Sequence, residues 1–312
     1  MRLGSDHVRV VVPATAANLG PGFDSLGLAL GIHDELEVRA LGSPDVVVEV
    51  TGEGAREVPD DDTHLVVRAL RLALDHVGAP QTGVHLTCTN RIPHGRGLGS
   101  SAAAAVAGIL AARGLIADPE ALDDAVALRL ANELEGHPDN AAPALLGGAT
   151  VAWCDVDGPH AVRLEPADVL TPVLLVPPDR LATSHARSVL PTRVPHGDAA
   201  FQAGRAALLV EALTRRPDLL LPATEDMLHQ QYRAAVMAQT LGLVGALRER
   251  GVAAVVSGAG PTVLVLARAA AAGAGTDADD VISDVLAEAC GDWQVVSPGV
   301  DGGGAHVARV GR

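Results

Sequence analysis

The chain has 312 residues, 48% of them hydrophobic, which is long enough to fold around two cores. Its net charge of −15 and its aromatic content of 2% argue against nucleic acid or an anionic membrane as a partner. All 23 of its Lys and Arg residues are arginine. This excludes Walker-type loops, protein kinases and pyridoxal-phosphate enzymes, because each of these needs a lysine.

The first half of the chain alternates apolar runs with helical spacing. Residues 8–12 are valines apart from Arg9, so we expect a strand that ends at Pro13. A helix is expected over residues 65–76, where apolar side chains recur at helical spacing before Gly78. Further strands are expected at residues 26–30, 36–38, 46–50 and 84–89.

In the second half, Asp118 and Pro119 predict the start of a helix that ends before Gly136. Other helices are expected at residues 201–214, 225–229, 241–250 and 281–289. Strands are expected at residues 151–153, 173–176, 252–257, 262–267, 294–296 and 306–310. This mixture predicts an α+β fold. Asp, Gly and Pro accumulate over residues 155–172, so we place the boundary between two domains there, as residues 1–160 and 161–312.

The segment from Pro93 to Ala103 predicts a phosphate site. Glycines at 95, 97 and 99 let backbone N–H groups approach an anion, and the alanine-rich helix that follows directs its positive N-terminal end toward it. Ser100 and Ser101 place two hydroxyls on the first helical turn, where they can reach a phosphate or its Mg²⁺.

This segment resembles the central motif of the GHMP kinases, PxxxGLGSSAA. Residues 13–30 and 257–265 resemble the first and third motifs of that family. The resemblance implies the two-domain GHMP kinase fold, with an N-terminal nucleotide-binding domain and a C-terminal α/β sandwich domain, and the use of ATP and Mg²⁺. The implied ATP-binding residues are His64, Pro93, His94, Gly95, Arg96, Gly97, Leu98, Gly99, Ser100, Ser101, Ala102, Ala103, Gly258 and Gly260.

A magnesium ion that arrives with ATP takes one or two protein oxygens and keeps several waters. Ser100 and one glutamate of the segment LANELEGHPDN would suffice. We favour Glu133, since helical spacing places it one turn before His137, and Glu135 stays open. A zinc site formed by the histidine and carboxylates of this segment is the less favoured alternative.

Within the family, the segment GHPDN resembles the homoserine kinases, as do residues 181–191 and 226–233. The resemblance implies an L-homoserine pocket. Arg187 and Arg233 can clamp an α-carboxylate and Asp24 can pair with the α-ammonium group, as a zwitterionic substrate requires. The implied substrate-binding residues are Asn18, Asp24, His137, Arg187 and Arg233.

The implied catalytic residues are Asn140, Asp139 and Thr183. Asn140 would orient the acceptor hydroxyl. Asp139 is a candidate general base, although a loose transition state tolerates late removal of the proton without one.

Three positions depart from the family pattern. His64 stands where an asparagine usually contacts adenine, Ala16 replaces a serine, and Gln231 replaces an acidic residue. A histidine can still donate one hydrogen bond to the base. Two alternatives stay open: another small-molecule kinase, such as a mevalonate-type enzyme, and a catalytically silent ligand sensor.

The cellular setting follows from what the sequence contains. Cys88, Cys154 and Cys290 show no metal-ligand spacing, and they fit reduced thiols. Neither a signal peptide nor a membrane span is recognisable. We therefore expect a cytoplasmic protein, and the family resemblance implies a homodimer.

Overall fold

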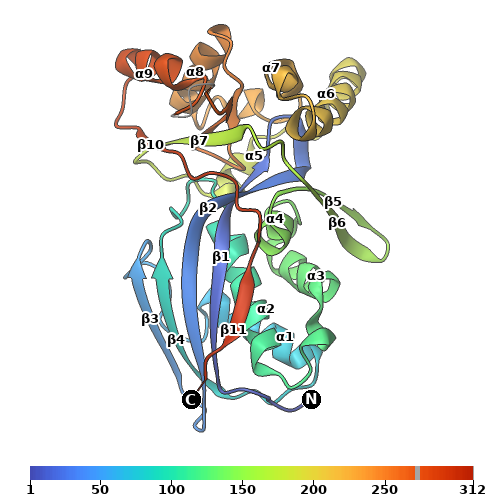
Figure 1. Ribbon diagram of the computed structural model, residues 1–312, viewed down its shortest axis with the longest axis vertical. Coiled ribbons are helices and arrows are strands. Elements are labelled where there is room, and N and C mark those ends of the chain that lie inside the picture. The colour runs from blue at the N-terminus through green and yellow to red at the C-terminus, as the bar shows by residue number, and fades with distance from the viewer. Residues whose placement is uncertain (271–274, 312) are drawn as a thin grey trace.

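The computed structural model describes residues 1–270 and 275–311. Two β-sheets lie one above the other along the length of the molecule, with both chain termini near the lower end (Figure 1). The larger sheet and its helices form the lower half. The smaller sheet lies in the upper half, between two groups of helices.

The larger sheet has seven strands, and its main path runs β11-β1-β2-β4-β3. β3 pairs with β4 in parallel, and the other pairs are antiparallel. Its strands are β1 (His7–Asn18), β2 (Gly22–Leu41), β3 (Val46–Gly52), β4 (Gly83–Asn90), β5 (Ala149–Asp155), β6 (Gly158–Leu164) and β11 (His306–Arg309).

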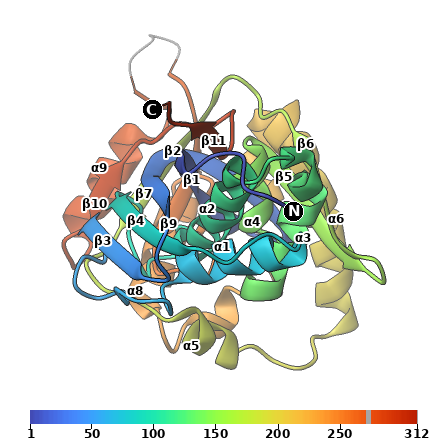
Figure 2. The ribbon, with the colours of Figure 1, turned by 90° about the horizontal axis from the view of Figure 1, so that it is seen from below.

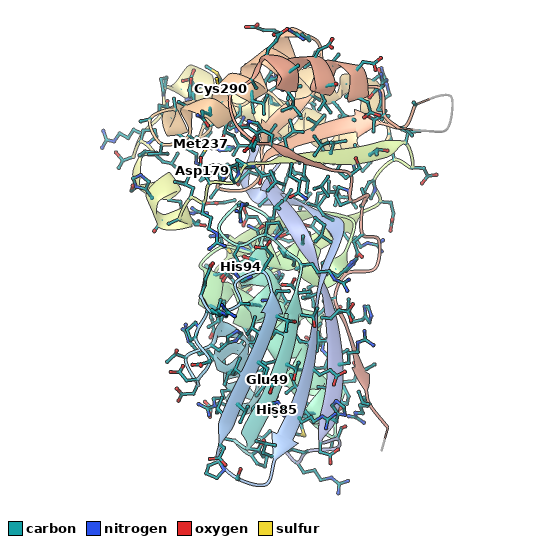
Figure 3. The ribbon with its side chains drawn as sticks, turned by 90° about the vertical axis from the view of Figure 1, so that its left-hand side faces the viewer. Glu49, His85, His94, Asp179, Met237 and Cys290 are labelled. Atoms are coloured by element: carbon teal, nitrogen blue, oxygen red, sulfur yellow. The ribbon has the colours of Figure 1, made fainter. Side chains whose placement is uncertain are left out.

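Helices cover one face of this sheet (Figure 2). They are α1 (Leu65–His76), α2 (Ser100–Leu115), α3 (Asp124–Glu135) and α4 (Ala141–Leu146), with the short 3₁₀ turn η1 (Pro119–Leu122). The other face carries polar side chains such as Glu49 and His85 (Figure 3). α2 is buried on nearly all sides, because its alanines and Gly108 let α1 approach closely.

The smaller sheet has the order β10-β7-β9-β8. Its strands are β7 (Leu170–Val176), β8 (Ala254–Val256), β9 (Val263–Arg268) and β10 (Gln294–Val296). The accompanying helices and 3₁₀ turns are α5 (Thr183–Ser188), α6 (His196–Thr214), η2 (Pro217–Leu219), α7 (Leu220–Ala223), η3 (Gln231–Arg233), α8 (Ala238–Glu249) and α9 (Asp279–Glu288).

Alternation along β7 gives the smaller sheet two apolar faces. Leu174 and Val176 belong to the core that continues into the lower half, whereas Val173 and Leu175 pack in a second core with residues of α8 and α9. Because both faces of the sheet are covered, residues 173–176 of β7 are all apolar, whichever face they point to. Among the described residues, no helix is long and apolar enough to cross a membrane.

The predicted α+β class is confirmed, and α1 has the predicted bounds. The prediction that the first strand ends at Pro13 is wrong, since β1 continues to Asn18. A register shift follows Pro13, and pairing with β11 ends at Val11. The proline therefore lies at an irregular edge, where its missing N–H breaks no ladder.

Two helix predictions are also corrected. Residues 225–229 form a turn, because the Asp226 carboxylate accepts the backbone N–H groups of residues 228, 229 and 230. Asp118 precedes only the 3₁₀ turn η1, and α3 begins after Asp123, whose side chain accepts from Val126 N. The division at residue 160 stays a prediction, although β6 and β11 both lie in the larger sheet.

Candidate active site

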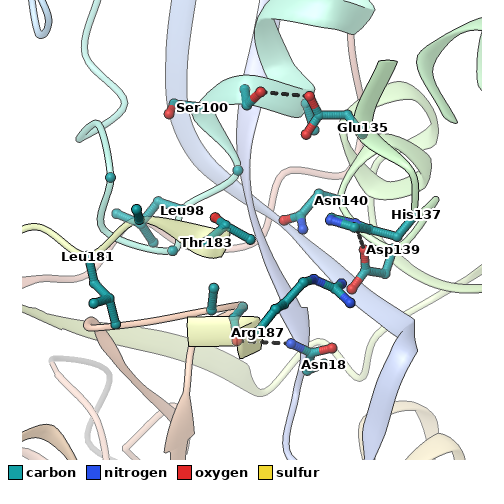
Figure 4. Close-up of a pocket in the computed structure, with 18 of the residues that line it drawn as sticks. Asn18, Leu98, Ser100, Glu135, His137, Asp139, Asn140, Leu181, Thr183 and Arg187 are labelled. Atoms are coloured by element: carbon teal, nitrogen blue, oxygen red, sulfur yellow. Dashed lines mark hydrogen bonds and ion pairs between the residues drawn. The ribbon is translucent and has the colours of Figure 1, made fainter. Parts of the chain in front are cut away.

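A cavity of about 420 Å³ lies where the two halves of the molecule meet (Figure 4). Its walls come from the phosphate segment, the end of α3 with the GHPDN segment after it, α5 with the two residues before it, and the turn after β8. β1 and η3 contribute one residue each. The lining residues are Asn18, Gly95, Gly97, Leu98, Gly99, Ser100, Ser101, Ala102, Leu134, Glu135, His137, Asp139, Asn140, Leu181, Ala182, Thr183, Arg187, Arg233, Gly258 and Ala259.

The predicted phosphate segment has the backbone geometry of an anion cradle. Gly95, Gly97 and Gly99 have φ values of 65°, 73° and 71°, in the left-handed region that side chains disfavour. A Cβ at Gly99 would lie 2.0 Å from Thr15 Oγ1. At Gly97 it would lie 2.2 Å from Ser257 O. The glycines thus serve both the conformation and the close approach of the other two motifs.

The third motif holds the cradle from the side of the smaller sheet. Ser257 Oγ donates to Gly97 O over 2.7 Å, and Gly258 N donates to Ala17 O over 3.0 Å. The three sequence motifs therefore meet in one place, although they are far apart along the chain.

A second cavity of about 230 Å³ shares Ser100 and Ser101 with the first and is lined mainly by apolar side chains. His64 lies on its wall and is buried, which lowers the pKa of its imidazole. Its Nδ1 accepts from Val66 N over 3.3 Å, so the neutral ring carries its proton on Nε2. An apolar cavity beside the phosphate cradle, with an N–H donor on its wall, suits a nucleobase.

The structure places Glu135, and not Glu133, at the cavity. Glu133 is exposed and lies outside both cavities, whereas Glu135 lines the first cavity and accepts from Ser101 Oγ over 2.6 Å (Figure 4). The helical spacing used to favour Glu133 fails because α3 ends at Gly136, which has φ 81°. His137 therefore does not continue the helix.

Burial raises the pKa of the Glu135 carboxyl, because the charged form is less stable away from water. Carboxylate and hydroxyl oxygens are the donors that Mg²⁺ prefers, so Glu135 with Ser100 or Ser101 fits this ion. Within the part of the chain that the structure describes, no cluster of three or more His, Cys, Asp or Glu side chains suits a metal held by protein alone.

The acceptor end of the cavity contains an ion pair between its expected ligands. Arg187 donates to both carboxylate oxygens of Asp24, over 2.5 and 3.2 Å, and about a third of each side chain is exposed. Arg187 lines the cavity, and Asp24 lies behind it. Arg187 and Asp24, which are predicted to bind opposite charges of a zwitterion, thus form an ion pair with each other.

Arg233 is 1% exposed, yet it lines the same cavity. Its Nε donates to Ala186 O, and its Nη1 contacts Gly258 O and His229 Nδ1. Among the described residues none is bonded to Nη2. Burial and the nearby Arg187 lower the pKa of Arg233 to about 10, so it remains a cation at neutral pH.

The GHPDN segment supplies two further pairs. His137 Nδ1 lies 2.6 Å from Asp139 Oδ1, and this hydrogen bond raises the pKa of His137. Asn140 Oδ1 accepts from Thr15 Oγ1 over 2.9 Å, which leaves the amide N–H groups of Asn140 for a ligand in the cavity (Figure 4).

Comparison with known proteins decides the family. A family model described as the GHMP kinases N terminal domain matches residues 64–148. A homoserine kinase from Streptomyces coelicolor is 54% identical over 301 residues, which cover 96% of this chain and 94% of its own. The chain belongs to the homoserine kinases of the GHMP kinase family.

Solved structures of homoserine kinases agree with this fold. The crystal structure of homoserine kinase from Cytophaga hutchinsonii matches with a TM-score of 0.82 at 26% identity, over 98% of each chain. A putative homoserine kinase from Listeria monocytogenes matches with a TM-score of 0.74 at 32% identity, over 97% of this chain and 100% of its own. The GHMP kinase fold expected from the motifs is confirmed.

Four of the residues predicted to bind the nucleotide line neither cavity. His94 and His64 line the second cavity and most of the others line the first. Pro93, Arg96, Ala103 and Gly260 line neither. Arg96 donates to the carbonyls of His94, Pro177 and Pro178, so it fixes the loop against the segment after β7.

Sequence reasoning missed two residues that shape this homoserine kinase site. Thr15 orients the Asn140 amide, and Asp34 lines the second cavity while accepting from the backbone of Arg91 and Ile92. Thr15 lies inside the first motif, which could have suggested a role. Asp34 lies within a strand with no local motif, so only the fold reveals it.

Proposed function

We propose that this protein transfers the γ-phosphoryl group of ATP to the side-chain hydroxyl of L-homoserine, forming O-phospho-L-homoserine for threonine biosynthesis. One observation carries the proposal: a single cavity contains the glycine cradle at one end and Arg187 and Arg233 at the other, with Asp24 bonded to Arg187. Membership of the homoserine kinases supports the same reaction.

The acceptor end suits an α-amino acid. The substrate carboxylate would bind Arg187 and the free Nη2 of Arg233, and the ammonium group would take the Asp24 carboxylate that Arg187 releases. An exchange of this kind replaces one ion pair by two. A sugar or an uncharged alcohol would offer no partner for either charge, whereas a mevalonate-type acid would leave Asp24 unpaired.

At the donor end, the base would occupy the second cavity beside His64, and the phosphates would lie over Gly95, Gly97 and Gly99. A Mg²⁺ ion held by Glu135 and a serine hydroxyl would offset the charge that develops on the phosphate oxygens. The backbone N–H groups at the start of α2 would bind the same oxygens through the positive helix end.

Asn140 would position the reacting hydroxyl by donating an amide N–H to its oxygen, because Thr15 occupies the amide oxygen. Asp139 is engaged by His137, so we assign it to holding that histidine and let the hydroxyl proton leave late in the reaction. Thr183, at the start of α5, lines the cavity between the two ends and would contact the transferring phosphate.

The proposal is tested by ADP release from MgATP with purified protein and a panel of acceptors: L-homoserine, mevalonate, L-serine, L-threonine and galactose. Turnover with L-homoserine alone is expected. Preferred turnover with mevalonate would refute the acceptor assignment and keep the donor site, and ATP binding without turnover of any acceptor would favour a ligand sensor.

The homodimer and the cytoplasmic location expected from the sequence stay predictions. Light scattering of the purified protein tests the first, and fractionation of the producing cells tests the second.

A further inference from the structure

The connection from β1 into β2, residues 18–24, has a strained backbone, and we call it the Asp24 loop. Asn18, Leu19 and Asp24 have φ values of 69°, 49° and 54°, and Arg56 is the remaining non-glycine residue with positive φ in the described chain. Such conformations are strained for residues other than glycine and persist only where surrounding contacts hold them. Something must therefore hold this loop.

Buried contacts with the other half of the molecule hold it. Gln202 Nε2 donates to Pro21 O over 2.9 Å, and Asn18 Nδ2 donates to Gly258 O over 2.9 Å. His229 Nε2 lies 2.7 Å from Gly20 O. The His229 side chain is completely buried and stacks on Phe23 of the same loop, with ring centroids 5.1 Å apart.

The hydrogen bonds of His229 determine its tautomer. Gly20 O can only accept, so Nε2 carries the proton and donates it. Nδ1 is then the acceptor, and Arg233 Nη1 donates to it over 3.1 Å. Burial lowers the pKa of His229, in agreement with a neutral ring. One imidazole thus connects the loop of Asp24 to the guanidinium of Arg233.

The remaining contacts of Arg233 show what this connection controls. Nε donates to Ala186 O and Nη1 donates to Gly258 O, so these two nitrogens are held by backbone carbonyls. Nη2 stays available to the cavity. Loss of the acceptor at His229 Nδ1 would let the guanidinium plane turn away from the position in which Nη2 meets a carboxylate.

We propose that His229, fixed as the neutral Nε2–H tautomer, is the positioning residue that aligns the two charged ends of the acceptor site: Arg233 for the α-carboxylate and the Asp24 loop for the α-ammonium group. It touches no reacting atom. The inference rests on the proposed function and extends it to a residue outside the cavity wall.

Two substitutions separate the two bonds. In His229→Gln the amide nitrogen can take the place of Nε2 and keep the bond to Gly20 O, but Arg233 loses its acceptor. In His229→Asn the amide oxygen can take the place of Nδ1 and keep Arg233, but the loop loses its donor. His160→Gln is the matched control, since that histidine is exposed on the β5–β6 hairpin.

The readouts are the KM for L-homoserine and the inhibition constants of two fragments: 4-hydroxybutanoate, which has only the carboxylate, and L-homoserinol, which has only the amine. His229→Gln is expected to raise the KM for L-homoserine roughly 10-fold or more and to weaken the binding of 4-hydroxybutanoate. The inhibition constant of L-homoserinol should not change. His229→Asn is expected to weaken L-homoserinol and spare 4-hydroxybutanoate. The KM for ATP should stay within about twofold in both.

If His229 had a purely structural role, both variants would bind both fragments more weakly and would have a higher KM for ATP. That result would overturn the proposal. A second test needs no variant to fold: ¹⁵N NMR of histidine-labelled wild-type protein should show the His229 ring, assigned through its contact with Phe23, protonated on Nε2 alone. An Nδ1–H ring or an imidazolium at His229 would also overturn it. Failure of the wild type to phosphorylate L-homoserine would instead refute the proposed function and leave the tautomer result standing.

Discussion

The donor and acceptor ends of the cavity are built in different ways. The proposed phosphate cradle comes from consecutive residues, Pro93 to Ala103, and would bind through backbone N–H groups and glycine conformation. The acceptor end comes from separate segments that contribute single side chains: Asp24, His137, Arg187 and Arg233. A local backbone device can be recognised in a sequence, whereas a site made of distant side chains depends on the fold.

The donor end also needs one distant side chain, and its identity gives the strongest test of this contrast. Glu135→Gln should lower kcat with MgATP by about 10²-fold or more, since it removes the carboxylate available to Mg²⁺. Glu133→Gln should leave kcat near the wild-type value, because that side chain is exposed outside the cavity. The reverse order of effects would restore the original choice of Glu133.

The cradle can be broken through its backbone alone. Gly99→Ala should lower kcat/KM for ATP by about 10²-fold, because the new Cβ would lie 2.0 Å from Thr15 Oγ1 and displace the partner of Asn140. Gly78→Ala is the control. It also has positive φ, but nothing lies within 4 Å of its Cβ, so it should cost only about 1–2 kcal/mol of stability and leave kinetics unchanged. Equal kinetic losses would mean that conformation alone matters.

The acceptor end should respond through one substrate only. Arg187→Ala is expected to raise the KM for L-homoserine by about 10- to 100-fold while the KM for ATP changes little, since the variant loses one carboxylate ligand and frees Asp24. Arg205→Ala is the control, because that arginine pairs with Glu225 and stacks on Phe201 away from the cavity. A change confined to ATP would refute the carboxylate clamp.

The smallest expected effect concerns the His137–Asp139 pair. The hydrogen bond to Asp139 raises the pKa of His137 above its ordinary 6.5, so the stabilisation is fully present below that pH. It is lost as pH rises through the folded-state pKa. Urea unfolding should therefore show a larger difference between wild type and His137→Asn at pH 6 than at pH 9, by about 1 kcal/mol per unit of pKa shift. A pH-independent difference would mean that His137 acts only as a packed ring.

Much of the fold follows from local patterns. The amphipathic spacing of residues 65–76 predicts the bounds of α1, and the glycines at 95, 97 and 99 all have the positive φ that favours glycine. Both depend on interactions within a few residues, which a sequence displays directly. The helix predicted at residues 225–229 is replaced by a turn, because the Asp226 carboxylate accepts backbone N–H groups there.

The acceptor site could be predicted only as a set of residue types. The charges of Asp24, Arg187 and Arg233 suggest a zwitterion, but spacing along the chain cannot reveal that Arg187 binds Asp24. Nor can it reveal that His229 joins Arg233 to Gly20. The choice between Glu133 and Glu135 depended on one left-handed glycine, Gly136, which ends α3 and changes the direction of everything after it.

The most direct test of the whole account is a crystal structure with L-homoserine, Mg²⁺ and a non-hydrolysable ATP analogue. We expect the amino-acid carboxylate on Arg187 and Arg233, the ammonium group on Asp24, and the hydroxyl beside Asn140 facing the γ-phosphate over the glycine cradle. An intact Arg187–Asp24 pair with the amino acid bound elsewhere would contradict the account.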